Sequence, residues 1–285
     1  MMTGPDRELG TLIDGGAFLE CPRWHDGRLW VSDFWRERVL AIAPDGTTEV
    51  VAEVPAWPGG LGWHPDGTPL VVSMQDNRVV RVRDGGLAPH ADLSEHSSGS
   101  GNDMVVDAAG GAYVGTVDFA GMATMPATNL LRVDPDGSVR VAAKDLAFPN
   151  GMVITPDGTT LVVAESWAAR LTAFDIGPDG SLSGRREWAP FAGAPDGLAL
   201  DAEGAIWVAD ASGNRAVRVR EGGEVLEEIG TGDFGVFACA LGGDDGRTLF
   251  LCASPTFDRD EAVASPRSRV LTCRVDVPAG PAGTA

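Results

Sequence analysis

The sequence predicts an all-β fold, a six-bladed β-propeller with four antiparallel strands in each blade. One pattern recurs along the 285 residues: a small turn containing Asp and Gly, then a short apolar strand that ends in Ser, Asp, Thr or Glu. The copies are HDGRLWVSD (25–33), HPDGTPLVVS (64–73), DAAGGAYVGT (107–116), TPDGTTLVVAES (155–166), DAEGAIWVAD (201–210) and GDDGRTLFLCAS (243–254). Their turn glycines lie about 40–48 residues apart, which is the period of a four-stranded propeller blade.

The remainder of each period supplies the other strands. A third strand often opens with Arg, as at Arg38 and Arg215, and a second Gly turn and a fourth strand usually follow. A β-sandwich is the alternative for apolar segments separated by Gly turns. It does not require six equal periods, so the repeat favours the propeller.

The last repeat lacks a fourth strand of its own, because the chain after Val277 reads PAGPAGTA. Residues 10–14, before the first repeat, are expected to pair with the last blade, close the ring and remove its open edge. We therefore expect a lead-in over residues 1–9, a single propeller domain over 10–277 and a disordered tail over 278–285.

The composition argues against several classes of partner. The chain has 41 acidic and 22 basic residues and a formal charge of −19, which would repel nucleic acid and an anionic membrane. No apolar stretch approaches the roughly 20 residues that span a bilayer, and the N-terminus shows no apolar signal-peptide core. We expect a soluble, cytoplasmic protein that acts on a small molecule as a monomer or a small homo-oligomer.

The four cysteines are expected to be free and mostly buried. Cys21, Cys239, Cys252 and Cys273 form no C-x-x-C pair and no spacing typical of a zinc site. Cys21 stands next to Glu20 and could be a nucleophile, but no nearby His is indicated to activate it.

Residues about eight positions before each turn glycine indicate a metal site. The innermost strand of each propeller blade lines the axial channel, so residues at equal offsets lie at one level around the axis. These positions are Glu20 (seven residues before its glycine), Gly59, Asn102, Asn150, Asp196 and Ala238. Converging oxygen side chains without a basic partner would repel, and a cation would resolve this conflict. Such ligands favour Ca²⁺, Mg²⁺ or Mn²⁺, while Zn²⁺ stays open.

A purely structural role is the alternative for these residues. N-D-M, P-N-G and P-D-G are ordinary turn sequences, so Asn102, Asn150 and Asp196 could each serve only to cap a turn. Their common register with Glu20 favours the metal site.

At these residues the chain resembles the family of senescence marker protein, gluconolactonase and luciferin-regenerating enzyme, the regucalcin-like lactonases. The resemblance covers roughly residues 12–277. Its carriers are the motifs ECPRW (20–24) with LWVSD (29–33), ND (102–103) ahead of VGT (114–116), FPNGM (148–152) and PDGL (195–198).

The resemblance implies a metal-dependent hydrolase that opens a lactone or a related cyclic ester. Glu20, Asn150 and Asp196 would bind one divalent cation, with Ca²⁺ favoured, and Asp196 would also transfer protons. Asn102 would contact the substrate or complete the metal shell. Sugar-lactone members carry Arg two residues before this Asn, where the present chain has Ser100, and position 21 is often Gly rather than Cys. The missing guanidinium argues against an aldonolactone substrate.

Loops that join second to third strands are expected to open on the face of the metal ligands and to shape the substrate pocket. They carry Trp35, Asp118, Phe119 and Trp167, which join Asn102 and Ser100 in the expected substrate-binding set. Aromatic walls with few basic groups suit an uncharged, partly apolar ring better than a polyanion. The longer loops, 118–129 and 255–268, are expected to be lids or disordered segments.

Two other functions remain open at this point. A propeller of this kind can bind a metal or a small molecule without turnover, and a family member can be recruited for non-hydrolytic biosynthetic chemistry. No Gly-x-Ser-x-Gly motif is present, which disfavours a serine hydrolase.

Overall fold

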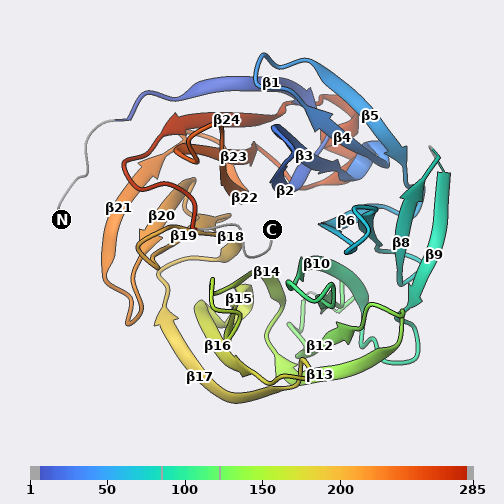
Figure 1. Ribbon diagram of the computed structural model, residues 1–285. Helices are drawn as coiled ribbons and strands as arrows, with labels where there is room; N and C mark the ends of the chain where they lie inside the picture. Colours follow the sequence, from blue (N-terminus) through green and yellow to red (C-terminus); the bar gives the residue numbers. More distant parts are fainter. Residues whose placement is uncertain (1–6, 85, 122, 281–285) are drawn as a thin grey trace.

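The computed structural model describes residues 7–84, 86–121 and 123–280. In these residues the chain forms six four-stranded antiparallel sheets that surround a central channel like the blades of a propeller (Figure 1). The predicted fold is therefore confirmed.

The strands of a blade follow one another in sequence from the channel to the rim, except in the last blade. The first two blades contain β2 (Leu19–His25), β3 (Arg28–Asp33), β4 (Arg38–Ile42), β5 (Thr48–Glu53), β6 (Pro58–Trp63), β7 (Pro69–Ser73), β8 (Arg78–Arg83) and β9 (Gly86–Asp92). The third and fourth contain β10 (Ser100–Val106), β11 (Ala112–Val117), β12 (Thr128–Val133), β13 (Val139–Leu146), β14 (Pro149–Ile154), β15 (Thr160–Glu165), β16 (Arg170–Ile176) and β17 (Leu182–Pro190). The fifth and sixth contain β18 (Pro195–Leu200), β19 (Ile206–Asp210), β20 (Arg215–Val219), β21 (Val225–Gly230), β22 (Gly235–Gly242), β23 (Thr248–Ser254) and β24 (Ser268–Arg274).

The last blade is completed by the N-terminal strand β1 (Gly10–Gly16), which lies along β24 in Figure 1. The two strands pair antiparallel, with Gly10 opposite Thr272, and Arg269 forms an ion pair with Asp14 at 3.1 Å. The predicted closure is thus confirmed, and the strand extends two residues beyond the predicted segment.

The chain after Val277 differs in part from the prediction of a disordered tail. Ala279 forms a β-bridge with Asp201 and donates its N–H to the Gly246 carbonyl at 2.8 Å, and Gly280 N–H donates to the Leu200 carbonyl at 3.2 Å. Residues 278–280 are therefore held against the propeller by backbone hydrogen bonds, while 281–285 lie outside the described residues.

The repeat turns adopt the left-handed backbone that their glycines suggested. Gly27, Gly67, Gly110, Gly158, Gly204 and Gly246 all have φ between 70° and 85°. A side chain is disfavoured in this conformation, so the turn that starts each second strand requires glycine for backbone reasons.

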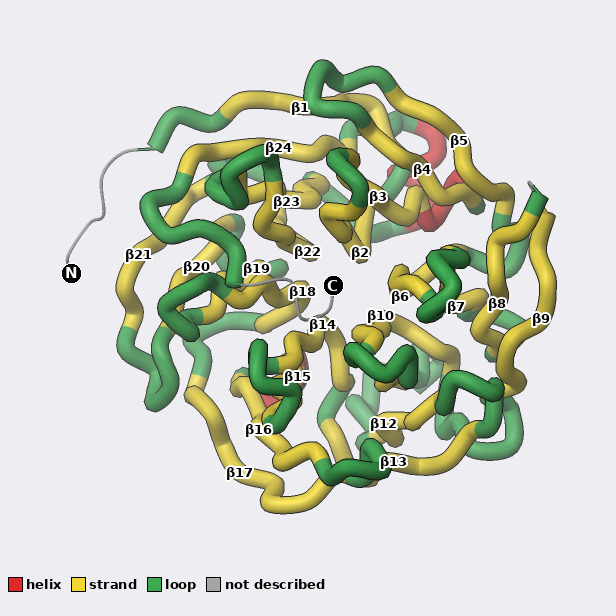
Figure 2. Tube along the Cα trace, in the orientation of Figure 1, coloured by secondary structure: helices red, strands yellow, loops and turns green. Residues whose placement is uncertain are grey.

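Three short helical segments lie in the loops on one face: η1 (Phe34–Arg36), η2 (Ser166–Ala168) and α1 (Arg259–Ala264). They are the red segments of Figure 2, where α1 and η1 lie beside the first blade. The Asp258 carboxylate caps α1 by accepting the Glu261 N–H at 2.9 Å. The long loop 255–268 thus contains an ordered helix.

The apolar core lies between neighbouring sheets. Val31 and Leu40 of the first blade pack with Ala238 and Phe250 of the last one, and similar clusters join the other sheets. Stacked, twisted sheets of this kind bury their faces against one another, and this fixes each inner strand next to its neighbours.

Buried carboxylates end the second strands of the first, fourth and fifth blades, and each pairs with the Arg that opens the third strand. The distances are 3.1 Å for Asp33 to Arg38, 2.9 Å for Glu165 to Arg170 and 3.0 Å for Asp210 to Arg215. These three acids have no exposed surface, so the cation and further hydrogen bonds are what make their burial tolerable. The recurring acid and Arg of the repeat are therefore one structural unit.

The innermost strands bend where they approach the axis. Pairing with the second strand shifts register between Glu20 and Arg23 in β2, and at the corresponding points of β10, β14 and β18. Such bulges redirect a side chain and often lie beside functional sites. They explain how residues at the predicted offset come to face the channel.

Within the described residues, no helix combines the length and apolar character needed to cross a bilayer. The four cysteines are free and buried, as predicted. Burial raises the pKa of the Cys21 thiol well above its usual value, with the Asp103 and Glu20 carboxylates adding to the effect. This disfavours a nucleophilic thiolate.

Removal of the closing strand tests this architecture. A chain that starts at Ala17 lacks β1, so the edge of β24 is left unpaired, and we expect a melting temperature lower by about 10 °C or more, together with self-association. Thermal melts and size-exclusion chromatography measure both effects. A chain that starts at Arg7 keeps β1 and is the control; equal melting of the two chains would contradict the closure.

Candidate functional site

One end of the channel opens into a cavity of about 440 Å³. Glu20, Asn102, Asn150 and Asp196 line its floor, each at the start of an innermost strand. The structure thus brings together the four oxygen-bearing residues that the repeat offsets selected.

The carboxamides on the floor form a connected chain of hydrogen bonds. Asn102 Nδ2 donates to Asn150 Oδ1 at 3.1 Å, and Asn150 Nδ2 lies 3.3 Å from Ser166 Oγ. Ser166 Oγ donates in turn to the Pro195 carbonyl at 2.7 Å, one residue before Asp196. Because these bonds cross three blades, they orient the Asn150 oxygen relative to Asp196.

Close backbone packing sets the spacing of Asn150 and Asp196. A Cβ on Gly151 would lie 2.5 Å from the Asp196 carbonyl oxygen, and one on Gly197 would lie 2.6 Å from Ala238 Cα. Only glycine permits such an approach, which is why Gly follows both ligand positions.

The surroundings of Glu20 and Asp196 disfavour the ionised form of both carboxyl groups. Burial raises the pKa of Glu20 to about 8, although Cys21 N–H donates to Oε2 at 2.8 Å. Burial first, and then the Glu20 charge, raises the pKa of Asp196 well above its usual range. Within the described residues no side chain or backbone N–H donates a hydrogen bond to the Asp196 carboxylate. The pair is therefore poised to accept positive charge from a ligand.

Arg23 is near these carboxylates but forms its ion pair with a different acid, Asp103. Arg23 donates to Asp103 Oδ1 at 2.9 Å and to the Met104 carbonyl at 2.6 Å, and both side chains of this ion pair are buried. Arg23 thus compensates Asp103. In the part of the chain that the structure describes, the two carboxylates at the cavity floor have no ion-pair partner, and their combined charge matches a divalent cation.

The donor set suits a hard cation. Two carboxylates with one carboxamide are oxygen ligands typical of Ca²⁺, Mg²⁺ or Mn²⁺. In residues 7–84, 86–121 and 123–280, no three His, Cys, Asp or Glu side chains are arranged to hold a metal on their own. The predicted ligands are two carboxylates and the carboxamide of Asn150, so they are not a group of three such side chains.

The buried acid and Arg units hold the segments that lead into the ligand positions. Asp33 accepts the N–H of Ala17 at 3.0 Å, Glu165 that of Ala147 at 2.8 Å and Asp210 that of Ala194 at 3.2 Å. These three donors lie two or three residues before Glu20, Asn150 and Asp196. The same units therefore position all three predicted ligands.

The predicted substrate-binding set is only partly brought to the cavity. Trp35, Phe119 and Trp167 line it together with Asn102. Ser100 and Asp118 do not line it, and their prediction as pocket residues is wrong for this cavity. The Asp118 carboxylate instead turns back to accept the Gly121 N–H at 2.9 Å, which stabilises its own loop.

Several aromatic wall residues were not in the predicted set. They are Phe18, Trp57, Phe148, Phe237 and Phe257, whereas Phe34 lies beside Trp35 in a loop that was expected to shape the pocket and does line it. Phe18, Trp57 and Phe148 each lie two positions before the ring residues Glu20, Gly59 and Asn150. The same offset argument that found the ligands could have found these three, if it had been applied one level higher in the channel.

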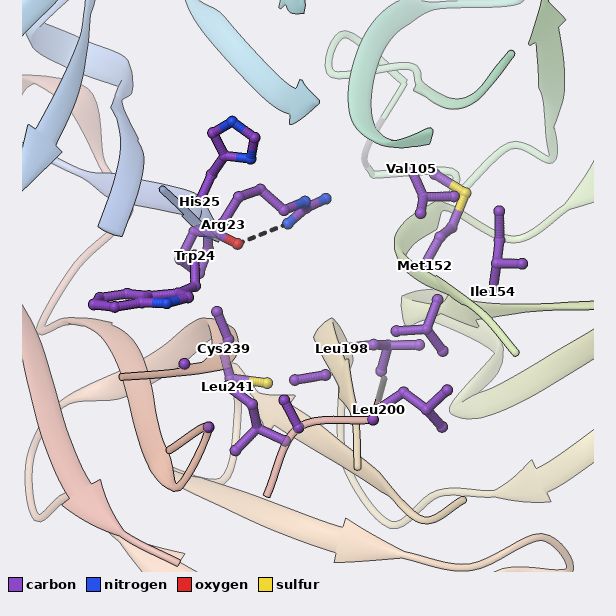
Figure 3. Close-up of a pocket in the computed structure, with 18 of the residues that line it drawn as sticks. Arg23, Trp24, His25, Val105, Met152, Ile154, Leu198, Leu200, Cys239 and Leu241 are labelled. Atoms are coloured by element: carbon purple, nitrogen blue, oxygen red, sulfur yellow. Dashed lines mark hydrogen bonds between the residues drawn. The ribbon is translucent and has the colours of Figure 1, made fainter. Parts of the chain in front are cut away.

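A second cavity, of about 410 Å³, lies at the opposite end of the innermost strands. Figure 3 shows its lining from several blades, with Arg23, Met152, Leu198 and Leu241 around the opening and the Trp24 ring turned away from Met152. His25 stacks on Trp63 with ring centroids 3.9 Å apart. The lining is largely apolar and lacks the converging carboxylates, so the first cavity is the candidate active site.

Comparisons with known proteins agree with this fold. Residues 18–254 match the model of the family described as SMP-30/Gluconolactonase/LRE-like region. The chain is 29% identical to the 6-deoxy-6-sulfogluconolactonase of Pseudomonas putida, over 91% of each chain. It is 29% identical to a pentonolactonase of Haloferax volcanii, over 81% of this chain and 80% of that one.

A solved structure supports the fold independently. The calcium-binding protein regucalcin of Agrobacterium tumefaciens superposes with a TM-score of 0.83 at 21% identity, over 99% of this chain and 98% of that one. The family match spans most of the chain, from the strand that bears Glu20 to the second strand of the last blade. The chain therefore belongs to the SMP-30/gluconolactonase/LRE-like family.

Proposed function

We propose that this protein is a metal-dependent hydrolase that opens a lactone or a related cyclic ester. The observation that carries the proposal is the pair of carboxylates, Glu20 and Asp196, at the floor of the cavity without a cation from the protein. Relatives of this chain that hydrolyse lactones support the reaction class.

Glu20, Asn150 and Asp196 are the proposed ligands of one divalent cation. Their oxygens fit Ca²⁺ in particular, and a relative with the same fold is described as calcium-binding. When bound, such an ion polarises an ester carbonyl and makes a water more acidic. Three protein ligands would leave positions open for substrate and water, as catalytic sites require.

The residues of the chain have separate roles in this proposal. Asp196 accepts the proton of the attacking water and returns one to the leaving alkoxide, since its carboxylate accepts no hydrogen bond from the described residues. Asn102 holds the Asn150 oxygen in place through its 3.1 Å hydrogen bond. The aromatic walls exclude bulk water, which strengthens the electrostatic interactions at the floor.

The metal site is tested by thermal stability. Because a cation that binds only the folded protein stabilises it by mass action, Ca²⁺ at 100 times its dissociation constant should add about 2.7 kcal/mol to the free energy of unfolding, and chelator should remove it. Melting curves measure the shift. Glu20→Ala, which removes the ligand oxygen, should lose most of it, whereas Glu49→Ala, on the exposed outer strand β5, should retain it.

A melt that does not respond to Ca²⁺, Mg²⁺, Mn²⁺ or chelator, in protein that elemental analysis finds free of metal, would count against the site. A full response in Glu20→Ala would reject Glu20 as a ligand.

The catalytic role of Asp196 is tested by Asp196→Asn. An amide can still offer an oxygen to the cation but cannot accept a proton at neutral pH, so lactone turnover should fall by about 10²–10⁴-fold while the fold persists. Circular dichroism and kcat measure the two effects. Wild-type protein that opens no lactone with any divalent metal, together with unaltered ligand binding in Asp196→Asn, would leave a binding propeller as the better description.

A further inference from the structure

We propose that the substrate is an uncharged lactone with a bulky apolar substituent, and that a polyhydroxylated sugar lactone is a poor substrate. This inference rests on the proposed function for the ring-opening step. Its independent basis is the chemistry of the cavity walls above the ligands.

The level directly above the ligands is apolar. Two positions before each ring residue the innermost strands carry Phe18, Trp57, Ser100, Phe148, Ala194 and Val236. Any substrate whose carbonyl lies at the floor must place its remaining atoms at this level. Ser100, the one hydroxyl of the set, does not line the cavity.

The aromatic rings of the cavity wall pack against one another in the absence of a ligand. Phe18 meets Phe237 with ring centroids 4.8 Å apart, and Trp35 meets Trp57 at 5.0 Å. On another blade Phe148 meets Trp167, also at 5.0 Å. Edge-on and tilted contacts of this kind hold each ring in place, so the walls need little reorganisation to accept an apolar group.

Apart from Arg259, the polar side chains that line the cavity are largely committed to one another. Asn102 donates to Asn150, Ser166 donates to the Pro195 carbonyl, and Asp258 caps helix α1. Glu20 and Asp196 belong to the proposed metal site. When a polyol enters the cavity, its hydroxyl groups lose their hydrogen bonds to water and gain no equivalent ones. Each hydroxyl left unpaired lowers the affinity by about tenfold.

The rim of the cavity exposes apolar rings that a ligand would cover. Phe119 is 39% exposed and Phe257 is 62% exposed, and both line the cavity. They lie in the two long loops, and the Arg259 guanidinium lies 5.9 Å from the centre of the Trp57 ring. An apolar substituent that extends from the floor toward this rim would bury these rings. Each methylene removed from water should improve kcat/KM by about fourfold.

Three lactones with the same six-membered ring test the inference. They are δ-valerolactone without substituents, δ-decalactone with a pentyl chain and glucono-δ-lactone with hydroxyl groups. With Ca²⁺ and subtraction of spontaneous hydrolysis, kcat/KM for δ-decalactone should exceed that for glucono-δ-lactone by at least about 1,000-fold, with δ-valerolactone between them. A preference for glucono-δ-lactone would overturn the inference.

Two tryptophans near opposite ends of one strand provide a matched pair of variants. Trp57, just before β6, lines the candidate active site, and Trp63, at the end of β6, lines the second cavity. Trp57→Ala should lower the preference for δ-decalactone over δ-valerolactone by about tenfold, while Trp57→Phe should largely keep it. Trp63→Ala should leave the preference unchanged. An equal loss in Trp57→Ala and Trp63→Ala would reject the wall as its source.

Binding of lactams separates the substrate class from the reaction. The amide analogues of δ-decalactone and glucono-δ-lactone resist hydrolysis, and Trp35, Trp57 and Trp167 provide a fluorescence signal in the cavity. Tighter binding of the alkyl lactam supports the inference even if no lactone is opened, in which case the proposed hydrolase fails alone. Tighter binding of the hydroxylated lactam would reject the inference while leaving the hydrolase intact.

Discussion

The ion pair between a fully buried carboxylate at the end of a second strand and the Arg that opens the third is the interaction on which the candidate site depends. Asp33, Glu165 and Asp210 each use one oxygen for this cation and another contact for a backbone N–H ahead of a ligand position. Removing the Arg would weaken the compensation of a fully buried carboxylate, which is costly even where a second Arg lies near, as Arg185 does for Glu165. The entry of the ligand-bearing strands is therefore rigid, and the channel keeps its geometry without the ligand.

The acids at the cavity floor have the opposite environment. Glu20 and Asp196 lie on the same framework, yet among the described residues neither forms an ion pair with an Arg, and Arg23 pairs with Asp103. The buried structural acids each have an Arg partner. Within the described part of the chain Glu20 and Asp196 have none, although they lie where side chains from several blades converge. This contrast favours a cation as the missing partner more strongly than the presence of carboxylates alone.

Much of this arrangement could be predicted from the sequence because it follows from backbone geometry. The turn glycines mark the repeat, since each needs a positive φ, and constant offsets from them place Asn102, Asn150 and Asp196 at one level. The direction of the Asp118 carboxylate could not be predicted, because it depends on a hydrogen bond within its own loop. The pairing of 278–280 uses only backbone groups and therefore leaves no pattern in the sequence.

The aromatic wall of the cavity was not predicted from the sequence for a different reason. Phe18, Trp57 and Phe148 share an offset from the ring residues, but apolar residues before a strand are usually core, and only the structure shows that these side chains line a cavity. The charged floor and the apolar wall are the two features on which the proposed substrate, a lactone with a nonpolar substituent, rests.

Crystals grown with Mn²⁺ would test the central claim most directly, through the anomalous scattering of the ion. The account predicts one strong peak in the channel, with oxygens of Glu20, Asn150 and Asp196 about 2.1–2.6 Å from it. A channel without a peak at saturating Mn²⁺, or an ion bound away from both Glu20 and Asp196, would contradict it.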